Sequence, residues 1–199
     1  MSATASGFIP GSGAGALVLE SLDSALNRGA YIYAEVLGGE INSGGQMGEG
    51  SMTAPNSIAV QRCIRNAVSN AGVHLSDIDV INGHLTATAK DGLEIENWSK
   101  SLERAGVDFP YINSFKSTVG HCLAAAGSIE SVATILQFKE KVVFKNVNCE
   151  DVHPEITNLI SETRVPRETL NHAPRVIAKA SFGFGDINAC VIFKAFVEE

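Results

Sequence analysis

The stretch "FKSTVGHCLAAAG", residues 115–127, places His121 next to Cys122, and a cysteine with a histidine base is a common enzymatic nucleophile. The pairing fails on geometry, because neighbouring residues of a helix point about 100° apart and cannot face each other. We therefore interpret Cys122 as a core residue. The chain's other cysteines form no C-x-x-C pair and show no metal-ligand spacing, so the sequence predicts neither an activated thiol nor a metal site.

A second histidine occupies a similar place in the chain. His84 follows the apolar run "IDVING" and lies in the polar stretch "NGHLTATAKDGLE" (82–94), and functional residues of α/β sheets commonly follow strands. Each histidine alone could simply be hydrogen-bonded at the end of an element. Because His84 and His121 both stand beside a glycine at such an end, we expect them to share one site.

A glycine-rich stretch raises nucleotide binding as an alternative. "GSGAGA" (11–16) nearly fits the dinucleotide fingerprint, with alanine in the place of the third glycine. That fingerprint follows a strand and opens a helix, whereas here the strand-like run "ALVLE" comes after it. We do not expect this stretch to bind a nucleotide.

The composition is that of one ordinary soluble globular domain. The chain has 199 residues, of which 45% are hydrophobic and 19% charged, and its formal charge is −7. Without a block of lysine or arginine, this charge argues against a nucleic-acid partner and against an anionic membrane. The first residues lack the basic and apolar regions of a signal peptide, and no apolar run reaches membrane-spanning length, so we expect a cytoplasmic protein.

Strands and helices alternate along the chain, which predicts an α/β layered domain to position these residues. Apolar runs rich in branched and aromatic residues predict strands over 14–22, 31–39, 78–83 and 111–117, and two more within 175–196. Periodic apolar positions with start and stop signals predict helices within 21–30 and over 55–72, 91–105 and 120–138. Because the last of these has only alanine or glycine at 124–127, we expect other backbones to approach it closely and bury several of its faces.

Four motifs follow one another along nearly the whole chain: "GFIPGSGAGALVLESLDSALNRGAYIYAEVLG" (7–38), "NGHLTAT" (82–88), "KSTVGHCLAAAG" (116–127) and "SFGFGDIN" (181–188). Together they resemble the C-terminal half of a β-ketoacyl-acyl carrier protein synthase, a thiolase-like condensing enzyme. The last three are similar to its Asn-Ala-His-Gly-Thr-Ser-Thr, Lys-x-x-x-Gly-His-x-x-Gly-Ala-Ala-Gly and Ser-Phe-Gly-Phe-Gly-Gly-Thr-Asn. The resemblance implies a five-stranded mixed sheet with helices on both faces, one half of a five-layer αβαβα fold.

The resemblance also implies the chemistry of the two histidines. His84 and His121 would belong to the family's Cys-His-His triad, and their N–H groups would stabilise charge on a thioester oxygen as malonyl-carrier protein loses carbon dioxide. Lys116 would hold them and their hydrogen-bond network in place. A helix N-terminus at His121 would lower the pKa of this imidazole and keep it neutral.

Five further residues receive roles from the same resemblance. Thr86 and Thr88 would contact the phosphopantetheine arm of the substrate. Asp91 and Glu94 would form an acidic pair that supports the site without touching the substrate. Phe184 would be the gate between the acyl pocket and the malonyl entrance, with glycine on either side to let it swing.

The nucleophilic cysteine belongs to the family's N-terminal half, which we expect residues 1–199 to lack. The resemblance therefore implies the C-terminal part of a 3-oxoacyl-acyl carrier protein synthase, an acyltransferase of fatty acid or polyketide elongation that is inactive alone. The alternative is a non-catalytic partner subunit like a chain-length factor; a thiolase would need a Cys-x-Gly that "DINACVIF" does not supply. The expected partners are acyl carrier protein, the nucleophile-bearing half and a second copy, and no cofactor is expected beyond the carrier's phosphopantetheine.

Several residues depart from the family's motifs, among them Ile187 in place of the threonine of the last motif, and the loop from Thr88 to Asp91 is one residue shorter than the family pattern. Leu85 replaces the glycine after the first histidine, Ala87 replaces a serine, and Asp186 replaces a glycine near the expected gate. Leu85 lies beside His84 and would affect its orientation. Asp186 adds a carboxylate that could alter acyl-chain selectivity or raise the pKa of a histidine.

Overall fold

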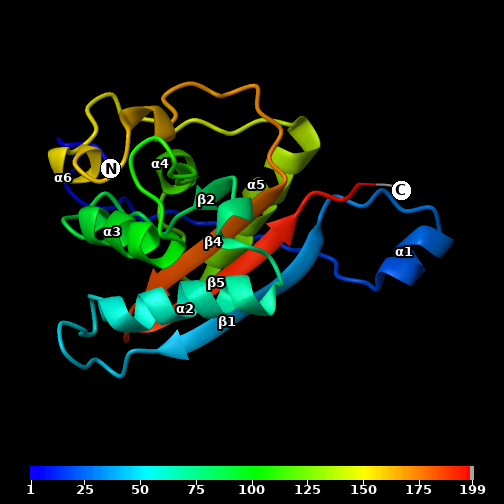
Figure 1. The fold of residues 1–199 in the computed structure, drawn as a ribbon, viewed down its shortest axis with the longest axis horizontal. Helices are drawn as coiled ribbons and strands as arrows, with labels where there is room; N and C mark the ends of the chain where they lie inside the picture. Colours follow the sequence, from blue (N-terminus) through cyan, green and yellow to red (C-terminus); the bar gives the residue numbers. More distant parts are fainter. Residues whose placement is uncertain (198–199) are drawn as a thin grey trace.

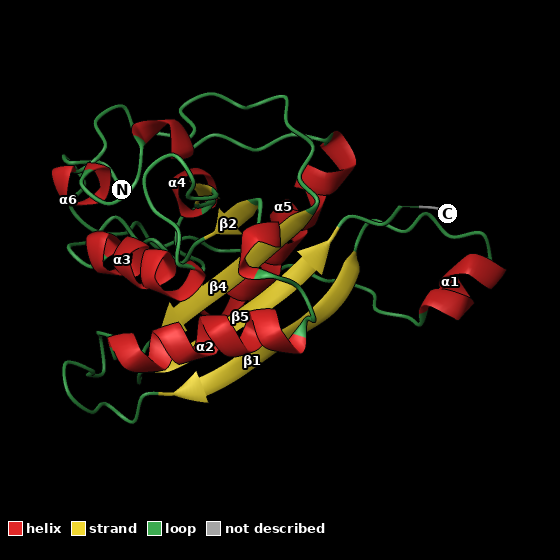
Figure 2. Cartoon of the chain, viewed as in Figure 1, coloured by secondary structure: helices red, strands yellow, loops and turns green. Residues whose placement is uncertain are grey.

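The computed structural model describes residues 1–197, which form a mixed five-stranded sheet with helices on both faces (Figures 1 and 2). The strands are β1 (Glu35–Ser43), β2 (Val80–Asn82), β3 (Tyr111–Asn113), β4 (Val176–Gly183) and β5 (Ile187–Lys194). Their order across the sheet is β1-β5-β4-β2-β3; β5 is antiparallel to both its neighbours, whereas β4, β2 and β3 run parallel. The predicted fold class is confirmed.

The helices are α1 (Leu22–Asn27), α2 (Ser57–Asn70), α3 (Asp91–Leu102), α4 (Lys116–Val119), α5 (Ala126–Glu140) and α6 (Pro154–Thr157). Three short 3-10 turns cover Leu75–Asp77, Leu123–Ala125 and Glu162–Arg164. Helices α2 and α3 cover one face of the sheet and α5 lies on the other (Figure 1). No helix within the described residues is long and apolar enough to cross a membrane.

Strand β4 shows how the sheet separates its two cores. Its residues point alternately to opposite faces. Ala178 and Phe182 join the larger core under α2 and α3, where Phe182 lies 6.3 Å from Trp98 between ring centroids. Ile177 joins the smaller core with Phe138 of α5. Lys179 therefore points to the face that α5 covers.

The strand predicted over 14–22 was wrong. The N-terminal arm, which we define as residues 12–34, is extended apart from α1 and pairs with no strand in the part of the chain that the structure describes. Its apolar run is largely exposed, with Val18 at 92%. The run has the composition of a strand, but no neighbouring strand supplies a ladder, and the strand predicted over 31–39 accordingly begins only at Glu35.

The glycines of "GSGAGA" have a packing explanation. A Cβ on Gly11 would lie 2.3 Å from the Val119 carbonyl oxygen, and one on Gly15 would lie 2.6 Å from the Ser128 carbonyl carbon. The backbone at these glycines thus passes directly over residues 119–129, where a larger side chain would collide. This explains the glycines without a phosphate.

Two predicted boundaries near the site were also wrong. The strand expected over 111–117 ends at Asn113, and Lys116 begins the short helix α4. The helix expected over 120–138 begins only at Ala126, because Gly120 (φ 73°) and Leu123 (φ 49°) interrupt it with left-handed backbone. His121 consequently lies in the connection before α5 and not on the helix.

Candidate active site

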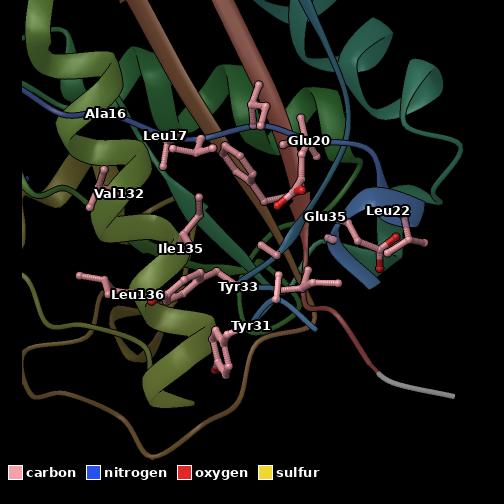
Figure 3. Close-up of a pocket in the computed structure, with 18 of the residues that line it drawn as sticks. Ala16, Leu17, Glu20, Leu22, Tyr31, Tyr33, Glu35, Val132, Ile135 and Leu136 are labelled. Carbon is pink, nitrogen blue, oxygen red and sulfur yellow. The ribbon is translucent and has the colours of Figure 1, made fainter. Parts of the chain in front are cut away.

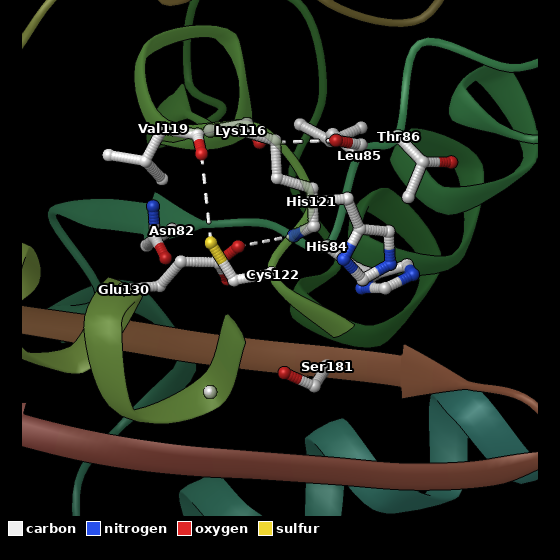
Figure 4. A network of polar contacts seen from close by, with 12 residues as sticks. Asn82, His84, Leu85, Thr86, Lys116, Val119, His121, Cys122, Glu130 and Ser181 are labelled. Atoms are coloured by element: carbon white, nitrogen blue, oxygen red, sulfur yellow. Dashed lines mark hydrogen bonds and ion pairs between the residues drawn. The ribbon is translucent and has the colours of Figure 1, made fainter. Parts of the chain in front are cut away.

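The parallel strands bring the two histidines together. Because β2 and β3 are parallel neighbours, the segments that follow them leave the sheet at the same edge. His84 comes two residues after β2, and the segment after β3 runs through α4 to His121. The two ring centroids lie 5.5 Å apart with an interplanar angle of 80°, and Figure 4 shows the rings side by side.

The position of His121 is fixed by its own loop and by the segment before the arm. Its backbone N–H donates to the Ile9 carbonyl oxygen at 2.7 Å, and its ring lies 4.9 Å from that of Phe8. The backbone N–H of Leu123 donates to Nδ1 at 3.1 Å, so a neutral ring carries its proton on Nε2. His121 thus offers one N–H donor at a defined atom.

Both histidines are held neutral. Burial lowers the pKa of His84 to about 2, with a further contribution from the charge of Lys116. Burial also lowers the pKa of His121, again followed by the charge of Lys116. The helix dipole invoked from the sequence is not the cause, because α5 begins only at Ala126. Two adjacent neutral imidazoles can donate hydrogen bonds to one developing oxyanion.

Lys116 lies within a buried ionic cluster. Its Nζ is 2.5 Å from Glu130 Oε1 on α5, and Lys179 Nζ is 2.7 Å from Glu130 Oε2 (the Lys116 contact is drawn in Figure 4). Sequence reasoning missed Glu130 and Lys179. The available signal was a single charged residue inside an otherwise small or apolar segment, "AAGSIESVATILQF" for one and "VIAKASF" for the other.

Two buried carboxylates support the loop that carries His84. Glu94 accepts the backbone N–H of His84 at 2.7 Å and that of Leu85 at 2.8 Å, and burial raises its pKa to about 7. Asp91 accepts the backbone N–H of Thr86 at 3.0 Å. These bonds hold a loop in which Leu85 (φ 21°) adopts left-handed backbone where the family motif has glycine.

The remaining predicted residues lie at different distances from this centre. Thr86 and Thr88 are neighbours, with their Oγ1 atoms 3.1 Å apart. Thr86, Lys116 and His121 line a cavity of about 520 Å³. Its lining does not include His84, Thr88 or Phe184. Phe184 is 58% exposed on the turn between β4 and β5.

Asp186 binds the glycine- and serine-rich loop after β1. Its buried carboxylate accepts the backbone N–H of Gln46 at 3.0 Å and that of Asn56 at 2.8 Å. Gly44 lies so close that a Cβ there would come within 1.9 Å of Asp186 Oδ2. The carboxylate absent from the family motif thus ties this loop to the turn that carries Phe184.

The cysteines take no part in the cluster of histidines. All four are buried free thiols, and Cys122 donates to the Val119 carbonyl oxygen at 3.6 Å rather than to a ring nitrogen. Burial raises the pKa of Cys63 to about 12, which disfavours a thiolate. Within residues 1–197, no group of three or more His, Cys, Asp or Glu side chains is arranged to hold a metal ion.

The chain is similar to known proteins along nearly its whole length. Residues 33–150 match the family model "Beta-ketoacyl synthase, C-terminal domain". The chain is 38% identical to 3-oxoacyl-[acyl-carrier-protein] synthase I, chloroplastic, of Arabidopsis thaliana, over 96% of this chain and 39% of that protein. It therefore spans about two fifths of the length of that relative.

Two solved structures share the fold. The ishigamide ketosynthase/chain length factor superposes with a TM-score of 0.87 and 31% identity, over 98% of this chain and 46% of that one. A ketosynthase bound to a hexaketide, in complex with its type II polyketide synthase acyl-carrier protein, superposes with a TM-score of 0.78 and 30% identity, over 89% of this chain and 42% of that one.

Proposed function

Because the chain belongs to the β-ketoacyl synthase family, we propose that it forms the histidine-bearing part of a 3-oxoacyl-acyl carrier protein synthase. The reaction is a decarboxylative Claisen condensation of malonyl-carrier protein with an acyl-enzyme thioester. The observation that carries the proposal is the pair of adjacent imidazoles, 5.5 Å apart, with the Lys116–Glu130 ion pair beside them.

The two imidazoles stabilise the transition state of decarboxylation. As the malonyl group loses carbon dioxide, negative charge develops on the thioester oxygen, and donors that already point at that oxygen lower the barrier. The Nε2–H of His121 is one donor, and His84 supplies the second. Lys116 keeps the local potential positive, which opposes protonation of either ring and favours the anion.

Substrate reaches this centre on the phosphopantetheine arm of acyl carrier protein, and the chain needs no cofactor of its own. Thr86 at the cavity wall contacts the arm, with Thr88 beside it. Phe184, exposed on its glycine-flanked turn, serves as the gate to the acyl pocket. Asp91 and Glu94 act indirectly, by holding the loop on which His84 stands.

The acyl-carrying nucleophile is not one of the four cysteines of this chain, because all four are buried and Cys122 donates to the Val119 carbonyl oxygen. We propose that a cysteine-bearing N-terminal half, on the same longer polypeptide or on a second chain, completes the site. The apolar side chains left exposed on the arm also favour association with a partner or with a second copy.

The alternative is a non-catalytic subunit that shapes the pocket of an active synthase. The similarity of this chain to the ketosynthase/chain length factor structure supports this alternative. The two functions differ in what they require of His84 and His121: a catalytic half needs both imidazoles, whereas a shaping subunit does not.

The test mixes this chain with a cysteine-bearing N-terminal half and measures decarboxylation of a malonyl thioester. His121→Ala should reduce the rate by about 100-fold or more, because one oxyanion donor is lost. His172→Ala is the matched control, since His172 is exposed and packs against Tyr111 away from the site. A rate that does not respond to His121→Ala would exclude the catalytic role and leave the shaping subunit.

A further inference from the structure

Lys179 is a second buried lysine that none of the motifs includes. It is the only charged residue of β4, and its side chain is 4% exposed. Its Nζ lies 2.7 Å from Glu130 Oε2, 2.9 Å from Ser181 Oγ and 2.6 Å from its neighbour's carbonyl oxygen, that of Ala180. Burial lowers the pKa of Lys179, and the charge of Glu130 opposes that shift. Three acceptors match the three protons of an ammonium group, so the contacts favour the charged form against the effect of burial.

The cluster contains more positive than negative charge. Lys116 and Lys179 bind the two oxygens of one carboxylate, Glu130, whose side chain is 1% exposed. The other carboxyls nearby are Glu94, which accepts two backbone N–H groups and has a pKa raised by burial to about 7, and Asp91, which pairs with the N-terminal ammonium group of Met1. With both lysines protonated, two ammonium groups share the carboxylate of Glu130, and one positive charge is left uncompensated.

An uncompensated buried positive charge lowers the stability of the folded chain, so stability does not explain the presence of Lys179. An apolar residue in place of Lys179 would leave the Lys116–Glu130 pair balanced, and buried ion pairs are not in general more stable than well-packed apolar substitutes. The charged groups that act on the two imidazole rings are Lys116 on α4, Glu130 on α5 and Lys179 on β4. Asp91 and Glu94 of α3 hold the backbone of the loop that carries His84.

We propose that Lys179 is a positioning residue of this site: by sharing Glu130 with Lys116, it leaves a net positive charge behind the two imidazoles that keeps them unprotonated and favours an anion in front of them. The nature of that anion, a malonyl carboxylate or the enolate formed from it, rests on the proposed function. The charge arrangement itself rests only on the contacts of Glu130.

The test measures the titration of His121 by NMR in the isolated chain. Lys179→Met removes the charge but keeps the length of the side chain, and it should raise the midpoint for His121 by about one pH unit, as expected for loss of one nearby charge at an intermediate effective dielectric. Lys179→Arg should restore a low midpoint. Lys100→Met is the matched control, because Lys100 is exposed and pairs with Glu96 on the far end of α3.

In the reconstituted enzyme, the acid limb of the decarboxylation pH profile should move with the same midpoint. A folded Lys179→Met chain whose His121 titrates as in the wild type would overturn the inference. If the variant does not fold, the wild type decides: two slowly exchanging ammonium signals at neutral pH support the proposal, and one alone refutes it. Since these readouts are titrations, they can fail while decarboxylation still depends on His121, and the reverse is also possible.

Discussion

The loop over 83–88 and the N-terminal arm are both largely irregular in backbone conformation. They differ in the hydrogen bonds that fix them. The loop is fixed by another element, because Glu94 and Asp91 of α3 accept its backbone N–H groups. The side-chain hydrogen bonds of the arm are internal, from Ser24 and Arg28 to Glu20.

The same contrast holds for apolar surface. Leu85 of the loop is 3% exposed, whereas Val18 and Leu19 of the arm are 92% and 72% exposed. A cavity of about 690 Å³, larger than the one that His121 lines, lies between the arm and Ile135 and Leu136 of α5 (Figure 3). The loop is thus complete within this chain, while the arm has the surface of an element that packs against something else.

The largest effect on stability should come from Glu130 of α5, whose carboxylate belongs to the ionic cluster next to the histidines. Glu130→Ala leaves two buried ammonium groups without their carboxylate, and we expect the free energy of unfolding to fall by about 3–5 kcal/mol. Urea unfolding followed by circular dichroism measures it. Glu140→Ala, at the exposed end of the same helix, should change stability by less than about 0.5 kcal/mol. A tolerated Glu130→Ala chain would mean that the cluster is hydrated.

The site residues that lie within sequence motifs could be predicted from the sequence. His84, His121 and Lys116 follow strands or glycines within recognisable stretches, and parallel pairing of β2 with β3 then brings them to one edge. Glu130 and Lys179 are 49 positions apart in the chain, and only the packing of α5 on β4 joins them.

The arm shows the complementary limit of prediction from sequence. "ALVLE" has the residues of a strand, but strand propensity reflects packing against neighbours, and the described residues provide no partner strand. The positive φ of Leu123 could not be predicted either, because leucine rarely adopts this conformation. The helix was therefore predicted to begin before Ala126, where α5 begins in the structure.

The next largest effect should be on the pH dependence of stability, to which the buried His84 of the loop contributes. Burial lowers the pKa of His84 from 6.5 to about 2, so between these values the unfolded chain binds a proton that the folded chain does not. This contribution to stability is present above pH 6.5 and is lost as the pH falls. For this histidine alone the loss from pH 7 to pH 5 is about 2 kcal/mol.

His84→Gln should remove that slope. The raised pKa of Glu94 acts in the opposite direction over this range, but it is common to both proteins and cancels in the difference. Urea unfolding at pH 5 and pH 7 measures the two slopes, with His172→Gln as the control that should keep the wild-type dependence. Equal slopes for His84→Gln and wild type would show that His84 is hydrated in the folded chain.

A smaller effect should come from the strained backbone of the loop. Ala87 adopts φ 58°, a left-handed conformation that costs an alanine about 1 kcal/mol and glycine very little. We expect Ala87→Gly to stabilise the chain by about that amount. The same substitution at Ala133, within α5, should destabilise by about 1 kcal/mol, because glycine is unfavourable inside a helix. Thermal unfolding of both variants compares the signs; a destabilised Ala87→Gly would contradict the strain.

The smallest effect on stability should come from substitutions in the arm. Their effect should appear in self-association instead. A Val18→Ser/Leu19→Ser double variant removes apolar side chains that are mostly in solvent, so stability should stay within about 0.5 kcal/mol of wild type. Self-association of the isolated chain, measured by sedimentation velocity over a concentration series, should weaken in this variant and not in Asn27→Ser, an exposed polar position of the same arm. If stability falls instead while association is unchanged, the arm packs on its own domain in solution, and the difference between the two regions disappears.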